Sequence, residues 1–81
     1  MSAKEYDFTV FFEPSTEGGY IVTVPALPGL VTEGDTLEEA RDMARDAIRA
    51  YIESLIKDGE PIPEEENTVQ ERIQVAIEAS S

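Results

Sequence analysis

The residue types that most often do chemistry in proteins are scarce in this sequence. Its 81 residues include no histidine and no cysteine, which excludes Ser–His and Cys–His nucleophiles and thiolate metal sites. The five serines and the two lysines have no activating neighbour in the sequence. Acid–base or metal chemistry would therefore depend on carboxylates, and a framework of strands and a helix could gather Asp7, Glu13, Glu33, Asp35 and Asp46.

A metal-dependent nuclease needs several carboxylates that converge on metal ions about 4 Å apart. Asp7 and Glu13 share one face of a predicted strand, and six residues along a strand span roughly 20 Å. These two side chains cannot share a metal ion, so the sequence predicts no catalytic residue, no cofactor and no metal site. A metal-dependent nuclease stays as an alternative function, which predicts RNA cleavage with Mg²⁺ or Mn²⁺.

Charge is the next constraint on function. Eighteen acidic residues against six basic ones give a net charge of −12. This charge repels a phosphate backbone, so we expect no direct binding of nucleic acid, and it attracts a basic partner. No stretch has the apolar length of a membrane span, and the N-terminus lacks the apolar run of a secretory signal. We therefore expect a cytoplasmic protein.

The first half of the chain has the alternating pattern of β-strands. Residues 6–13 place aromatic and β-branched side chains at every second position, and residues 20–24 repeat the pattern after a glycine-containing turn at 14–19. The two runs predict an antiparallel hairpin. A proline loop at 25–29 ends the second strand, and residues 30–33 form a short third strand.

A long helix follows the third strand. Thr36 and Glu39 have the spacing of an N-terminal capping box, and Gly59 predicts an end near Asp58. The acidic, proline-rich connector that follows is typical of a solvated loop, and it could also dock a basic partner. The polar side of the helix carries a row of basic residues that is either solvated or faces a partner, namely Arg41, Arg45 and Arg49.

The last segment, Thr68–Ala79, fits two structures. Apolar side chains alternate from Ile73 to Ile77 as in a strand, whereas Thr68 and Glu71 have the spacing of a capping box that would start a helix. We favour the strand, because a long amphipathic helix needs a sheet face to cover and a fourth strand widens that face.

The predicted fold class is therefore α+β, with the element order β-β-β-α-β in one domain over residues 1–81. A fourth, parallel strand extends a three-stranded antiparallel meander, and the helix covers one face. The other face carries Phe11 and Ile21 and stays uncovered, so we expect it to associate with another copy. A homodimer is the expected assembly, and a tetramer is the alternative.

The most specific run of the sequence extends from Gly18 to Ala40 and reads GGYIVTVPALPGLVTEGDTLEEA. The pieces AIRAY at 47–51 and DGEPIP at 58–63 follow it. This combination of sequence motifs resembles the HicB-like antitoxin family over residues 6–77. The resemblance implies a reduced ribonuclease-H-like fold, in which one long helix covers one face of a mixed four-stranded sheet. Many members carry an additional DNA-binding domain, which we do not expect in this chain.

The resemblance also implies a function in binding. Members of the family pair with HicA, a small basic toxin that cleaves RNA with a histidine, and the antitoxin covers that site. The alternative is a solitary structural or regulatory homo-oligomer without a toxin. The predicted partner-binding residues lie along the proline loop, the third strand and the helix, and they are Tyr20, Pro25, Leu27, Pro28, Leu30, Val31, Arg41, Arg45 and Arg49.

Overall fold

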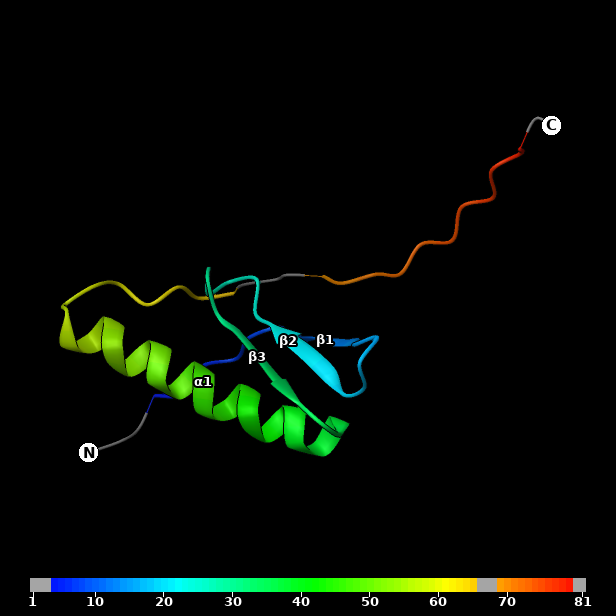
Figure 1. Ribbon diagram of the computed structural model, residues 1–81. Helices are drawn as coiled ribbons and strands as arrows, with labels where there is room; N and C mark the ends of the chain where they lie inside the picture. The colour runs from blue at the N-terminus through cyan, green and yellow to red at the C-terminus, as the bar shows by residue number, and fades with distance from the viewer. Residues whose placement is uncertain (1–3, 66–68, 80–81) are drawn as a thin grey trace.

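The computed structural model describes residues 4–65 and 69–79 and shows an α+β fold (Figure 1). Three strands form one antiparallel sheet in the order in which they occur in the chain. A single long helix packs across one face of that sheet, mainly against the third strand and less against the second. The elements are β1 (Phe11–Pro14), β2 (Tyr20–Thr23), β3 (Val31–Gly34) and α1 (Leu37–Lys57).

Strand β1 is shorter than predicted because its neighbour ends early. The ladder between β1 and β2 runs from the pair Phe11 and Thr23 to the pair Pro14 and Tyr20. Beyond Thr23 the chain soon turns into the proline loop, so residues 6–10 precede β1 without a strand opposite them in the described sheet. Pro14 is tolerated within the ladder because β1 is an edge strand.

Two glycines let the β2 hairpin, the end of β3 and the start of α1 approach one another closely. A Cβ atom at Gly34 would lie 2.7 Å from the Cα of Ala40, and one at Gly19 would lie 2.5 Å from the carbonyl oxygen of Gly34. Gly19 also has a φ of 76°, a conformation that glycine adopts most readily. These glycines therefore allow the first turn of the helix to lie directly on the sheet.

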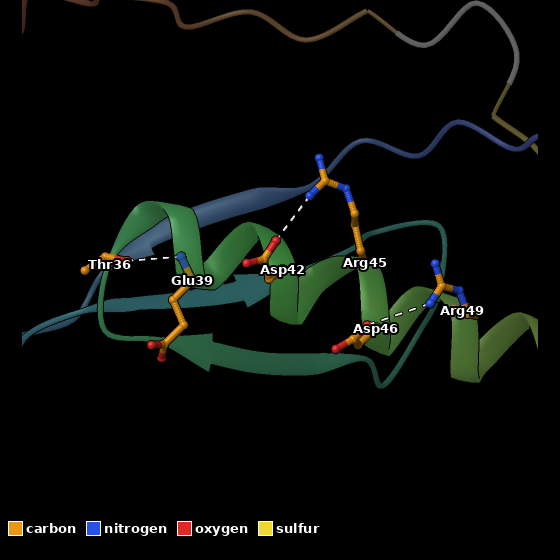
Figure 2. Close-up of polar contacts among 6 residues, drawn as sticks. All are labelled: Thr36, Glu39, Asp42, Arg45, Asp46 and Arg49. Atoms are coloured by element: carbon orange, nitrogen blue, oxygen red, sulfur yellow. Dashed lines mark hydrogen bonds and ion pairs between the residues drawn. The ribbon is translucent and has the colours of Figure 1, made fainter.

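Helix α1 begins and ends where the sequence predicts. The backbone amide of Glu39 donates to Oγ1 of Thr36 at 3.0 Å (Figure 2), and Oε1 of Glu39 accepts from the amide of Asp35 at 3.0 Å. At the other end, Gly59 adopts a φ of 69°, and its amide donates to the carbonyl of Ile56 at 3.1 Å. Both predicted caps are thus confirmed.

Replacing Thr36 with alanine is expected to lower the free energy of unfolding by about 1 kcal/mol, because the amide of Glu39 loses its acceptor. Urea denaturation followed by circular dichroism measures the change. Thr36→Ser is the matched control, since it keeps the hydroxyl, and it should unfold like the parent chain. Equal destabilisation by both substitutions would show that the hydroxyl does not cap the helix.

The core lies between α1 and the sheet as two small clusters. Ala40 and Ala44 are short enough to let α1 approach β2 at Val22. The second cluster lies further along the helix, beneath the proline loop, and contains Val24, Leu27, Leu30 and Ile52. These seven are the buried apolar side chains of the described residues, and so small a core gains stability from any partner surface.

The predicted fourth strand is not confirmed. Within the described residues the sheet has three strands, so neither the mixed four-stranded sheet nor the ribonuclease-H-like fold that it would complete is confirmed. Residues 69–79 belong to neither a helix nor a strand, and all of them are exposed. Figure 1 shows this tail running away from the body. The alternation of its side chains is present, but a strand also needs a neighbouring edge. Thr68, the predicted start, lies outside the described residues.

Candidate protein-binding site

The proline loop is an ordered surface that is folded around one leucine. The amide of Leu27 donates to the carbonyl of Val24 at 2.9 Å, and the amide of Leu30 donates to the carbonyl of Leu27 at 3.1 Å. The hydroxyl of Tyr51 donates to the carbonyl of Pro28 at 3.0 Å and ties the loop to α1. These bonds hold the rings of Pro25 and Pro28 at the surface, where both residues are exposed.

Three of the predicted binding residues face the protein interior. Leu27 is fully buried and Leu30 is 8% exposed, so a partner cannot reach either side chain while the loop stays folded. Tyr20 is half-buried and packs against the cluster around Val22. The two leucines therefore shape the loop from within. The alternating pattern at 20–24 did not extend to the loop, so the sequence left the direction of its leucines open.

The sheet face away from α1 has an apolar centre with carboxylates beside it. Val31 is 66% exposed and Ile21 is 40% exposed. The register places Ile21 between Glu13 of β1 and Glu33 of β3. A shallow hollow beside β3 extends this surface to Met43 of α1. We call this surface the outer sheet face.

The arginine row lies on the exposed side of α1, as the helical spacing predicts. Arg45 Nη1 lies 3.3 Å from Asp42 Oδ1, and Arg49 Nη1 lies 4.0 Å from Asp46 Oδ1 (Figure 2). Both pairs are largely exposed, so each contributes at most about 1 kcal/mol. Their main effect is to hold the two guanidinium groups close to the helix.

Two shallow hollows lie beside the arginine row, and Arg45 and Ile48 line both of them. The hollow next to β1 has an apolar floor of Val10, Phe12 and Ala44. The other follows residues 4–8 along α1. We call the hollow next to β1 the β1 groove. The sequence did not reveal it, because Val10 and Phe12 fall on the face predicted to lie under the helix. Both do pack against the cluster around Val22, but α1 lies mainly over β3 and leaves them half-buried.

The acidic connector after α1 is held against the segment that precedes β1. Lys4 Nζ lies 2.8 Å from Glu64 Oε1, and the hydrogen bond and Coulomb attraction of that carboxylate raise the pKa of Lys4. The amide of Thr9 donates to the carboxylate of Glu65. These contacts fix the point at which the chain leaves the body on the β1 side.

Carboxylates do not converge on one point in the described part of the chain. Within residues 4–65 and 69–79, no three acidic side chains gather closely enough to hold a metal ion. As for membranes, α1 is the helix that the structure describes, and it lacks the apolar length needed to cross one.

The described residues combine a net acidic charge with an apolar outer sheet face and an apolar groove, features that suit contact with another protein. The family model for the HicB-like antitoxin of bacterial toxin–antitoxin systems matches residues 8–78. The chain therefore belongs to the HicB-like antitoxin family. This match confirms the resemblance noted in the motif from Gly18 to Ala40.

Three relatives of this chain differ in the share of their own length that aligns with it. A UPF0150 protein from Synechocystis is 43% identical over 80% of this chain and 82% of its own length. A UPF0150 protein from Thermoplasma acidophilum is 52% identical over 69% of this chain and 81% of its own length. Antitoxin HicB 1 from Photorhabdus laumondii is 38% identical over 96% of this chain, which spans half of that antitoxin's length.

Proposed function

We propose that this chain is an antitoxin that sequesters a small, basic, RNA-cleaving toxin of the HicA kind by covering its active site. Membership of the HicB-like antitoxin family carries the proposal, and the alignment of Antitoxin HicB 1 with nearly the whole chain supports it. The net charge of −12 suits a basic partner, because complementary charge speeds encounter. The same charge disfavours direct contact with RNA or DNA. Because such a toxin acts on cellular RNA, we expect the pair to function in the cytoplasm.

The outer sheet face and the neighbouring prolines are the surface that suits such a toxin. Val31 offers an exposed apolar side chain, and Pro25 and Pro28 continue the surface on the loop. Glu13 and Glu33 supply carboxylates on either side of it. An apolar centre with charged surroundings is the usual form of a protein interface. The arginine row is predicted as part of the same partner-binding surface, but it carries the same sign of charge as a basic toxin, so this proposal does not include it.

Inhibition of RNA cleavage tests the proposal. The first step is to look for a gene of a small basic protein beside the gene of this chain. That protein is then purified and assayed on RNA with increasing amounts of the full chain. One equivalent of the chain is expected to abolish cleavage. Val31→Arg places a positive charge in the proposed surface and should weaken inhibition at least about tenfold. Ala50→Arg adds the same charge at an exposed position of α1 and should leave inhibition unchanged.

Undiminished cleavage in excess antitoxin would contradict the proposal. Native purification that recovers only copies of the chain itself would then favour the solitary homo-oligomer, a reading that the exposed outer sheet face also suits. Equal effects of the two arginine substitutions would retain the antitoxin function and reject the outer sheet face as its site.

A further inference from the structure

The tail of residues 69–79 contains four of the nine large apolar side chains that are exposed in the described residues. Val69 is 78% exposed, Ile73 is 73%, Val75 is 69% and Ile77 is 84%. The tail projects from the body (Figure 1), and the molecule measures 63 × 30 × 21 Å along its principal axes. Scattered exposed side chains need no explanation, but four in one extended segment indicate a surface that becomes covered.

The pattern of the tail is that of a strand with one buried face. Ile73, Val75 and Ile77 point to the same side of an extended chain, and Gln74 and Glu78 point to the other. The segment contains no proline or glycine and is rich in β-branched residues. Such a segment is stable only when its backbone pairs with a sheet edge and its apolar side chains reach a floor.

The β1 groove provides both the edge and the floor. Strand β1 is an edge of the sheet, and its side chains Val10 and Phe12 form the floor together with Ile48 of α1. Helix α1 covers this part of the sheet only partly, because it packs mainly over β3 and less over β2, and Val10 and Phe12 are left half-buried. A strand added to β1 would place every second side chain over the groove.

The charges at the groove suit the tail. Arg41 and Arg45 line the groove next to β1. Glu71 lies two residues before Ile73, so its carboxylate is on the same side of an extended tail as the isoleucines. The tail itself carries two acids and one base, a charge of −1 within a chain of −12. Insertion of the tail therefore adds little repulsion to the groove and brings opposite charges together.

We infer that the tail of one copy adds as a strand to β1 of a second copy and fills its β1 groove. Each chain has one exposed tail and one open groove. When two chains exchange tails, each tail fills the groove of the other chain, and the result is a dimer with twofold symmetry. The contacts of Glu64 with Lys4 and of Glu65 with Thr9 fix the exit of the tail beside β1, and from there it runs away from its own body. This inference does not depend on toxin binding.

Sedimentation of the full chain measures the exchange. The parent chain is expected to sediment as a dimer. Replacing Ile73 and Ile77 with aspartate should raise the dimer dissociation constant at least about 100-fold, since each buried isoleucine is worth about tenfold or more. The control replaces Gln70 and Gln74 with aspartate. It introduces the same charge on the other side of the tail and should leave the dimer intact. Circular dichroism checks that all variants stay folded, as they should because the tail lies outside the core.

A mixed-label NMR sample identifies what the tail covers. Equal amounts of ¹³C-labelled and unlabelled chain are combined, and filtered nuclear Overhauser effects are recorded between copies. Effects between the methyls of Val75 in one copy and Phe12 or Ile48 in the other are expected. A monomer with its tail on its own β1, a monomer with a free tail, or a dimer that survives the Ile73/Ile77 substitution would each overturn the inference.

Discussion

Replacing Gly34 with alanine is expected to lower the free energy of unfolding by about 3 kcal/mol or more, the upper range for overpacking a buried site. The new Cβ would lie 2.7 Å from the Cα of Ala40 and 2.9 Å from the carbonyl carbon of Glu39. Both are backbone atoms, which cannot rotate away as a side chain can. The first turn of α1 would therefore have to lift from β3, and the cluster around Val22 would open with it. Urea denaturation measures the loss.

Gly29→Ala is the matched control for that experiment. Gly29 has a φ of 86°, but a Cβ built there meets no atom within 4 Å. Its substitution should lower the free energy of unfolding by only about 1 kcal/mol, because alanine disfavours the left-handed backbone conformation. If Gly34→Ala were no more destabilising than Gly29→Ala, the close approach of helix and sheet at Gly34 would be disproved.

Leu27→Ala is expected to lower the free energy of unfolding by about 3 kcal/mol, within the range for truncating a fully buried leucine. The side chain is fully buried, and the loop bonds from Val24 to Leu30 are wrapped around it. Ile56→Ala removes a similar amount of hydrocarbon from a residue that is 60% exposed, and it should change stability by no more than about 0.5 kcal/mol. Thermal and urea denaturation of both variants give the comparison.

The same pair of variants separates stability from binding. At a temperature where Leu27→Ala remains folded and its loop keeps the parent conformation, its affinity for a toxin should equal that of the parent chain, because a partner cannot reach the buried leucine. A large loss of affinity in the folded variant, with parent affinity for Ile56→Ala, would return Leu27 to the binding surface that the sequence suggested.

The elements governed by local rules were predictable from the sequence. The helix follows from Thr36, Glu39 and Gly59, whose effects extend over only a few residues, and its bounds are confirmed. The three strands follow from alternation and from prolines and glycines between them. The ladder of β1 is the exception, because its length depends on where β2 turns away. Strand pairing depends on two segments, so the sequence of one segment alone does not determine how far the ladder extends.

The candidate site was less predictable for the same reason. The exposure of Pro25, Pro28 and Val31 could be predicted from their positions in the sequence. The burial of Leu27 could not, because it depends on two turns that the local sequence does not determine. The β1 groove depends on the sideways position of α1 over the sheet, which amphipathic spacing does not specify. The tail shows most clearly what local sequence cannot predict. Its side chains alternate as in a strand, but the sequence of the tail does not show which sheet edge it would pair with.

The order of the strands and the helix along the chain affects how the protein folds. Each element packs against its neighbour in the chain, from β1 to β2, from β2 to β3 and from β3 to α1. Much of the ordering entropy is therefore lost in short loops, and mixed domains of helix and sheet fold faster than all-β domains dominated by non-local pairing. Exchange of tails requires two bodies to meet, so it becomes a separate, slower step whose rate rises with concentration. If the tails exchange as we infer, the folded monomer precedes the dimer at low copy number, with its binding surfaces already formed.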